Sequence, residues 1–361
     1  MNPLKTLSTH GQSVWLDFID RKLMSSGDLS RLIDADGVRG MTSNPSIFEK
    51  ALAASTDYDD SLRAALAKQP DIDVKTLYET LVIEDIRSAA DVLRTVYDES
   101  NGDDGYVSLE VSPKLANDTA ATIEEAKRLW AWVDRPNLMV KVPATGAGVP
   151  AVEALIAAGL NINVTLMFSL QHYEDIAQAY IRGLARCEHP ERVASVASFF
   201  VSRVEAAVDE ALHAIGTEQA RAVQGKTAVA NAKLAYKRFG EIFGGASFSD
   251  LRAKGGRVQR PLWASTSTKN PDYNDVMYVE ELIGPDTVNT LPPATLEAFR
   301  DHGKAARTID YDVPAAQATF DTLELLGIDL DAITEQLQME GVAAFESSFE
   351  TLIAALQEKL A

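Results

Sequence analysis

The amino-acid sequence predicts an α/β protein built as a (β/α)8 TIM barrel with additional helices. Eight short apolar segments are separated in most places by helical patterns, which is the alternation expected of a parallel sheet. Most of these segments are continuous apolar runs, as in strands that are covered on both faces. The rival open sheet usually carries a glycine-rich turn after its first strand, and none follows Phe18, so closure into a barrel is favoured.

The predicted strands and helices alternate along most of the chain. The strands are expected at 13–18, 37–44, 105–112, 137–144, 161–168, 193–202, 259–266 and 287–291. The helices are expected at 78–97, where apolar residues recur at spacings of three and four, and at 118–133, 151–158, 169–187, 218–243 and 331–360. Pro150 suits the first turn of the third helix, and Ser169 can cap the fourth.

The chain has the size and composition of one large folded domain. Its 361 residues are 46% hydrophobic, which is sufficient for a large buried core, and no linker divides them. We therefore expect a single barrel domain over residues 1–361, with a helical extension at the C-terminus. The length beyond a minimal barrel lies in 49–76, in 216–256 and in this extension.

Charge and cysteine content narrow the function classes. The net charge is −19, so the acidic surface is expected to repel nucleic acid and anionic membranes. The chain shows no signal peptide and no apolar run long enough to span a membrane, and its only cysteine is Cys187. These features favour a cytoplasmic enzyme with small-molecule partners. They leave the oligomeric state open, and a homo-oligomer is compatible with them.

Polar side chains fall in the middle or at the C-terminal end of the predicted strands. In chain order they are Asp17, Asn44, Glu110, Lys141, Asn163, Thr165, Ser198 and Arg203. A barrel interior is filled mainly by branched apolar side chains, so charged groups there are costly unless they take part in chemistry. Because barrel enzymes place their active sites at the C-terminal ends of the strands, these residues are candidates for one shared site.

Lys141 is the central residue of this set. It lies in Leu-Met-Val-Lys-Val-Pro, where burial would favour the neutral amine that can attack a ketone and form an imine. A protonated imine is an electron sink for breaking the adjacent carbon–carbon bond. The alternative is a lysine on an edge strand that points to solvent.

Asp17 and Glu110 are the candidate proton carriers. Imine formation needs an acid to expel water, and aldol cleavage needs a base at a substrate hydroxyl. A carboxylate too close to Lys141 would keep it protonated, so we expect Glu110 to act through a water molecule rather than by direct pairing. The alternatives are a helix cap or loop start for Asp17 and an ion pair with Lys114 for Glu110.

Two further residues have simple structural alternatives, and no metal site is predicted. Asn44 could be only the turn signal of its Asn-Pro pair, and Arg203 only a solvated residue of a first helical turn. The histidines are scattered without the spacing of metal ligands, at His10, His172, His189, His213 and His302. We therefore expect neither a metal nor another cofactor.

Six motifs occur in one order along the predicted strands. They are Val-Trp-Leu-Asp17, Thr-Ser-Asn44-Pro-Ser, Ser-Leu-Glu110-Val-Ser, Met-Val-Lys141-Val-Pro-Ala-Thr, Asn163-Val-Thr165-Leu-Met-Phe-Ser and Ser198-Phe-Phe-Val-Ser-Arg203. Each motif alone is weak. The ordered set, within a similarity that covers about residues 13–299, resembles transaldolases and specifically the longer bacterial branch of that family.

The resemblance implies a fold, a reaction and a set of roles. Transaldolases are (β/α)8 barrels of the pentose phosphate pathway that move a dihydroxyacetone unit between sugar phosphates. They interconvert sedoheptulose 7-phosphate plus glyceraldehyde 3-phosphate with erythrose 4-phosphate plus fructose 6-phosphate. By resemblance, Lys141 is the Schiff-base lysine, Asp17 handles the proton of the C4 hydroxyl, and Glu110 with Thr165 holds a catalytic water. The residues that match substrate contacts are Asn44, Asn163 and Ser198, with Arg203 as the phosphate ligand.

The chain departs from the family pattern in two places. Phe199 and Ser202 stand where many members have proline and glycine. No arginine follows the seventh strand, where shorter members supply a second phosphate ligand, and Lys269 could take that place.

Two alternatives to a transaldolase remain open. One is a class I aldolase that releases the three-carbon unit instead of transferring it. The other is a barrel without catalysis that only binds sugar phosphates or a partner. This second alternative gives no reason for a buried amine together with Asp17 and Glu110.

Overall fold

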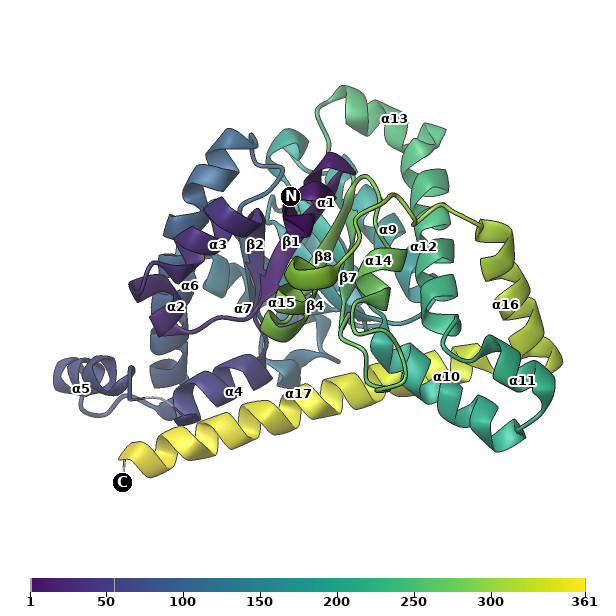
Figure 1. The fold of residues 1–361 in the computed structure, drawn as a ribbon. Helices are drawn as coiled ribbons and strands as arrows, with labels where there is room; N and C mark the ends of the chain where they lie inside the picture. Colours follow the sequence, from purple (N-terminus) through teal and green to yellow (C-terminus); the bar gives the residue numbers. More distant parts are fainter. Residues whose placement is uncertain (1, 55, 361) are drawn as a thin grey trace.

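A closed barrel of eight parallel strands forms the centre of the computed structural model, which describes residues 2–54 and 56–360 (Figure 1). The strands follow in sequence order around the barrel, and the last pairs with the first. They are β1 (Gln12–Asp17), β2 (Val38–Thr42), β3 (Tyr106–Glu110), β4 (Leu138–Pro143), β5 (Ile162–Met167), β6 (Ser195–Phe200), β7 (Arg260–Ala264) and β8 (Thr287–Leu291). The predicted (β/α)8 barrel is therefore confirmed.

Helices surround the barrel and connect its strands. They are α1 (Pro3–Thr9), α2 (Arg21–Ser25), α3 (Asp28–Asp36), α4 (Pro45–Ala54), α5 (Asp59–Lys68), α6 (Val74–Glu99), α7 (Thr119–Val133), α8 (Gly148–Ala157), α9 (Leu170–Ala185), α10 (Ser202–Ile215), α11 (Glu218–Val223), α12 (Thr227–Gly244), α13 (Ala246–Ala253), α14 (Met277–Glu281), α15 (Pro293–His302), α16 (Val313–Leu325) and α17 (Leu330–Leu360). Short 3-10 helices occupy Pro113–Leu115 and Pro190–Arg192.

The predicted elements differ from the observed ones mainly at their ends. The segment predicted at 193–202 is longer than β6 because Ser202 is already the first residue of α10. Ser169 caps α9 as predicted, since its hydroxyl accepts a hydrogen bond from the backbone N–H of His172. All six residues of β4 are buried, which explains why the strand is a continuous apolar run interrupted only by Lys141.

One predicted helix is two helices in the structure. The segment 218–243 is divided into α11 and α12 by a turn at residues 224–226. Gly225 in this turn has a φ of 70°, a left-handed conformation that glycine adopts without steric cost. The backbone N–H of Thr227 then starts α12 by donating to Glu205 at 3.0 Å. The sequence pattern predicted one helix because both halves are helical.

The C-terminal extension is one long helix, α17, which passes α4 and α10 and is drawn in yellow (Figure 1). It also contacts the C-terminal ends of two barrel strands, because the side-chain amide of Gln338 donates to Ala144 O and Leu166 O, both at 3.0 Å. The apolar side of this helix faces the protein, and it buries Val342, Phe345, Phe349 and Leu356, with Leu337 partly buried.

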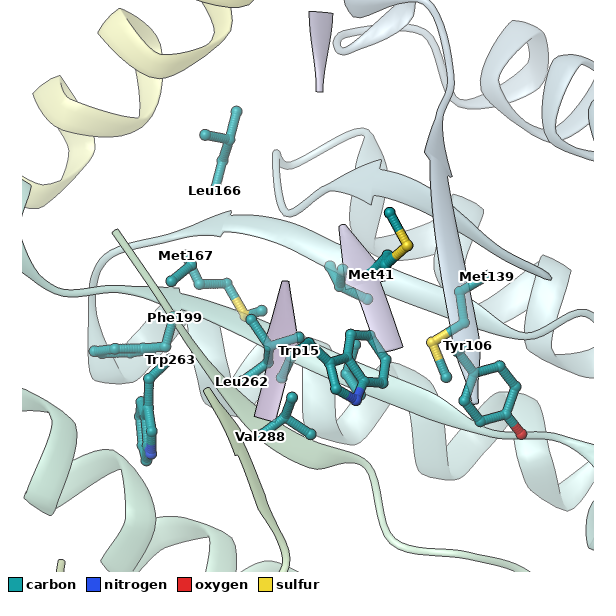
Figure 2. Close-up of a cluster of buried hydrophobic side chains, with 14 of the residues drawn as sticks. Trp15, Met41, Tyr106, Met139, Leu166, Met167, Phe199, Leu262, Trp263 and Val288 are labelled. Carbon is teal, nitrogen blue, oxygen red and sulfur yellow. The ribbon is translucent and has the colours of Figure 1, made fainter. Parts of the chain in front are cut away.

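Large apolar side chains fill the interior between the strands (Figure 2). Trp15 of β1 is fully buried, and its indole N–H donates to Asp104 Oδ1 at 2.7 Å. Its neighbour on β2 is Gly40, where a Cβ atom would lie 2.6 Å from carbons of the indole ring. Gly40 therefore provides the space that the indole occupies.

Gly40→Ala is expected to lower the free energy of unfolding by about 1–3 kcal/mol, the usual cost of overpacking a core. Denaturant-induced unfolding followed by fluorescence measures this loss. Gly240→Ala in α12 is the matched control, because a Cβ atom there meets nothing within 4 Å and alanine is the better helix former. If both variants are as stable as the wild-type protein, contact with Trp15 does not restrict the size of the side chain at position 40.

Candidate active site

Lys141 lies on β4 of the barrel, and the residue is only 5% exposed. It belongs to β4, which pairs with β3 on one side and with β5 on the other. A closed barrel leaves no edge strand, so the alternative of an edge lysine that points to solvent is wrong. The cost of burying the amine must instead be offset by polar neighbours.

Three groups surround the Lys141 amine. Nζ donates a hydrogen bond to Ser43 O at 3.0 Å and lies 3.3 Å from Glu110 Oε2. On the side of α17, Nζ lies 5.9 Å from the centre of the Phe345 ring. The amine is thus held between β2, β3 and the C-terminal helix.

Direct contact between Lys141 and Glu110 replaces the water-mediated arrangement that we expected from the sequence. The two residues are register partners on β3 and β4, which brings their side chains to the same level of the barrel. Their contact has the distance of an ion pair but lacks hydrogen-bond geometry. Lys114, the alternative partner of Glu110, instead pairs with Glu350 of α17 at 2.8 Å.

Two carboxylates near the amine have raised pKa values. Burial raises the pKa of Glu110, Lys141 opposes this effect, and the negative charge of Asp17 adds to it. Burial also raises the pKa of Asp17, against a hydrogen bond from Thr42 and the charge of Lys141. Because each carboxylate is shifted towards neutral pH, both are better proton acceptors than ordinary surface carboxylates.

Asp17 ends β1 and does not cap a helix. Its Oδ1 accepts a hydrogen bond from the Thr42 hydroxyl at 2.6 Å, and that hydroxyl lies 2.7 Å from the Thr290 hydroxyl. The cap of the following helix, α2, is Asp20. The alternative role of Asp17 as a helix cap is therefore wrong, and β2 and β8 fix the position of its carboxylate.

Asn163 connects three strands beside Lys141. It is the register partner of Lys141 on β5, and its side-chain amide donates to Ser108 Oγ at 3.0 Å on β3. Its Oδ1 accepts a hydrogen bond from Ser198 Oγ at 2.6 Å on β6. Because β3 and β5 flank β4, this buried chain of polar groups lies next to the amine.

Thr165 carries a buried hydroxyl that has no hydrogen-bond partner among the described residues. It follows Asn163 by two residues on β5, so both side chains point to the same side of the strand. A buried polar atom is normally satisfied, by water if not by protein. The Thr165 hydroxyl is therefore available to a bound water or a substrate.

Asn44 forms a turn, which was the structural alternative to a substrate contact, and it also lies next to the site. Its Oδ1 accepts a hydrogen bond from the backbone N–H of Ile47 at 3.0 Å, in the first turn of α4. Asn44 lines a cavity of about 20 Å³ together with Ser43, Glu110 and Tyr78, and Lys141 is not among the lining residues. A space of this size holds one water molecule.

Arg203 is the second residue of α10 and is partly buried. The centre of its guanidinium lies 5.2 Å from the centre of the Phe200 ring, and burial lowers its pKa. Within the described residues no carboxylate forms an ion pair with it. A partly buried cation without a counter-charge, unlike a solvated one, provides a local site for an anion such as phosphate.

Lys269 lies apart from these residues, in the loop after β7, and is exposed. Its amine donates to Ser267 Oγ at 3.0 Å. The cleft that it lines also contains Glu205 and Asp209, and neither Lys141 nor Arg203 is among its lining residues. Eight of the nine predicted site residues thus lie on barrel strands or within three residues of their C-terminal ends, whereas Lys269 lies further along the exposed loop after β7.

Several residues at the site were missed by sequence reasoning. Thr42, Ser43 and Ser108 belong to the quoted motifs, so their polar character was a usable signal. Gln338 and Phe345 had no such signal, because the C-terminal segment reads only as an amphipathic helix.

Neither a metal site nor a membrane span is found in the part of the chain that the structure describes. Over residues 2–54 and 56–360, no three side chains from histidine, cysteine, aspartate or glutamate are grouped so that they could hold a metal ion. No helix in these ranges is both long and apolar enough to cross a membrane.

Comparison with known proteins agrees with the geometry. A family model described as Transaldolase/Fructose-6-phosphate aldolase matches residues 14–356. A transaldolase of Thiobacillus denitrificans is 49% identical over 360 residues, which cover 99% of this chain and 100% of the relative. A transaldolase of Mycolicibacterium smegmatis is 47% identical over 365 residues, with 99% and 98% of the two chains covered. The chain therefore belongs to the transaldolase/fructose-6-phosphate aldolase family, as the ordered motifs predicted.

Proposed function

We propose that this enzyme catalyses the transaldolase reaction through an imine between Lys141 and the ketone of a sugar phosphate. The transaldolase activity follows from the family, and one observation carries the covalent mechanism. A buried lysine at the C-terminal side of a closed barrel lies beside Glu110 and Asp17, two carboxylates with raised pKa values. Such a cluster is expensive to bury and is typical of sites that move protons.

The reaction begins with proton transfer from the ammonium group of Lys141. Glu110 Oε2, 3.3 Å from Nζ, is the nearest proton acceptor, and its raised pKa favours the transfer. The neutral amine adds to the ketone carbon, Glu110 returns its proton, and loss of one water leaves a protonated imine. The hydrogen bond to Ser43 O holds the nitrogen in position before it reacts.

Carbon–carbon cleavage then depends on Asp17. Its carboxylate takes the proton of the C4 hydroxyl, and the electron pair of the C3–C4 bond moves to the imine. An aldose phosphate leaves, and the three-carbon unit stays on Lys141 as an enamine. The enamine attacks the aldehyde of an acceptor, whose oxygen recovers the proton from Asp17. Hydrolysis of the new imine releases the product ketose and the free lysine.

A water molecule held by Glu110 and Thr165 serves the addition and loss of water at the imine. One feature that the two residues share supports this role. The Thr165 hydroxyl and Glu110 Oε2 are both buried without a hydrogen-bond partner among the described residues. Buried polar atoms are normally satisfied, by water where the protein offers no partner.

Substrate recognition is assigned to the polar residues around the amine. Asn44, Asn163 and Ser198 contact substrate hydroxyls, and Arg203 binds the phosphate. The partly buried and unpaired guanidinium supports the role of Arg203. Lys269 is retained as the second phosphate contact proposed from the sequence, although its carboxylate neighbours oppose anion binding.

The wider function follows from the same proposal. The substrates are the sugar phosphates of the pentose phosphate pathway, the enzyme uses no metal or other cofactor, and it works in the cytoplasm, where its single free cysteine stays reduced.

We also propose that residues 1–361 form one domain. In support, one hydrophobic cluster extends from the barrel strands to Phe349 and Leu356 of α17.

Transfer should dominate over simple cleavage. With fructose 6-phosphate as donor, we expect rapid release of glyceraldehyde 3-phosphate only when erythrose 4-phosphate is present, because the enamine on Lys141 needs an acceptor to turn over. A coupled assay of glyceraldehyde 3-phosphate, run with and without acceptor in excess chelator, measures this. Equal rates without acceptor would favour the class I aldolase. Activity lost to the chelator and restored by a divalent ion would contradict the metal-free mechanism.

Arg203→Ala is expected to raise KM for fructose 6-phosphate about tenfold or more, because a charge-assisted hydrogen bond contributes roughly 1.5–3 kcal/mol. The kcat/KM for unphosphorylated fructose should change much less, since it has no phosphate. Steady-state kinetics with both donors test this, and Lys269→Ala serves as the matched variant. Equal losses on both donors would give Arg203 a structural role, and an unchanged KM in Lys269→Ala would remove Lys269 from the phosphate site.

A further inference from the structure

Leu166 has an unusual backbone conformation directly beside the site. Its φ is 60°, in the left-handed region that leucine rarely adopts. The register between β5 and β6 shifts between Val164 and Met167, so the strand bulges where Thr165 and Leu166 lie. Such a conformation persists only where the surrounding structure holds it, and a bulge changes the direction in which a side chain points.

The side-chain amide of Gln338 in α17 is one group that holds it. Nε2 donates to Leu166 O and to Ala144 O, both at 3.0 Å, and the side chain is buried. An amide nitrogen has two hydrogens, one for each of these carbonyls. Ala144 directly follows β4, and its N–H donates to Thr165 O at 2.8 Å. Gln338 therefore ties together the ends of the strands that carry Lys141 and Thr165.

The Leu166 side chain is held by the same helix. It is 1% exposed and stands apart from the other labelled core side chains in Figure 2. Gly341 lies beside it, and a Cβ atom added to Gly341 would be 2.9 Å from Leu166 Cδ2. The helix thus contacts both the carbonyl and the side chain of the strained residue.

We propose that α17 sets the catalytic geometry of β5 through Gln338 and Gly341. By holding Leu166 in its left-handed conformation, Gln338 fixes the bulge at the end of β5 and, with it, the position of the preceding residue, Thr165. Gln338 is a positioning residue, because it acts through the backbone of Leu166 and not on the substrate. This inference rests on the proposed roles of Lys141 and Thr165.

Gln338→Met tests the inference, because methionine has a similar length and no N–H group. We expect kcat for transfer to fall by about tenfold to a hundredfold, the usual effect of misplacing a reacting group, while KM for both substrates stays nearly constant. Gln336→Met is the matched control on the same helix, since Gln336 is exposed and its amide donates to Glu340. A full kcat in Gln338→Met would overturn the inference.

A double-mutant cycle with Leu166→Gly separates positioning from a general loss of structure. Glycine adopts positive φ without steric cost, so the bulge should need Gln338 less in this background. We therefore expect Gln338→Met to reduce kcat by a smaller factor when residue 166 is glycine. The same factor in both backgrounds would show that Gln338 does not act by holding Leu166.

Gly341→Ala provides a second variant in case Gln338→Met fails to fold. Alanine strengthens the helix but pushes on Leu166 Cδ2, so kcat should fall without loss of thermal stability, and Leu166→Gly should restore part of it. An unchanged kcat would contradict the inference. Borohydride trapping in the wild-type enzyme distinguishes failure of the proposed mechanism from failure of this inference. If no adduct forms on Lys141, the proposed mechanism fails. If the adduct forms normally and the variants are fully active, only the inference about Gln338 fails.

Discussion

The contact between Lys141 Nζ and Glu110 Oε2, 3.3 Å apart inside the barrel wall, is the interaction on which the rest of the site depends. A buried ion pair is costly to form and more costly to leave half complete, so removal of Glu110 would strand a buried ammonium group. Burial raises the pKa of Glu110 against the effect of Lys141, and the charge of Asp17 adds to the rise. The proposed transfer of a proton from Lys141 to Glu110 depends on this raised pKa of the Glu110 carboxyl.

The fold explains how such a cluster is tolerated. Parallel register brings Glu110, Lys141 and Asn163 to one level on three adjacent strands, where Lys141 lies against Glu110 and Asn163 bonds to Ser108. On the other side, α17 places Phe345 over the amine and Gln338 on the strand ends, and this cover limits access of bulk water. The barrel supplies the residues, and the C-terminal helix completes the surroundings in which their charges interact strongly.

The sequence was sufficient for those features that leave a local pattern. The strands appear as apolar runs, and Lys141 and Glu110 stand out as charges within them. The direct contact between these two residues could not be read in this way, because it depends on the register of separate strands. The contact of Gln338 with Ala144 joins positions 194 residues apart, and an amphipathic helix pattern does not say what the helix covers. The break at Gly225 was missed for the opposite reason, since helical residues flank it on both sides.

Reductive trapping tests the proposed chemistry most directly. The enzyme is incubated with fructose 6-phosphate and borohydride, and the modified lysine is identified by peptide mapping. The chain offers an internal control in Lys233, a second buried lysine that pairs with Glu281 at 3.1 Å. We expect the reduced adduct on Lys141 alone and no adduct in Lys141→Ala. An adduct on Lys233 or another lysine, or full transfer activity in Lys141→Ala, would contradict the mechanism.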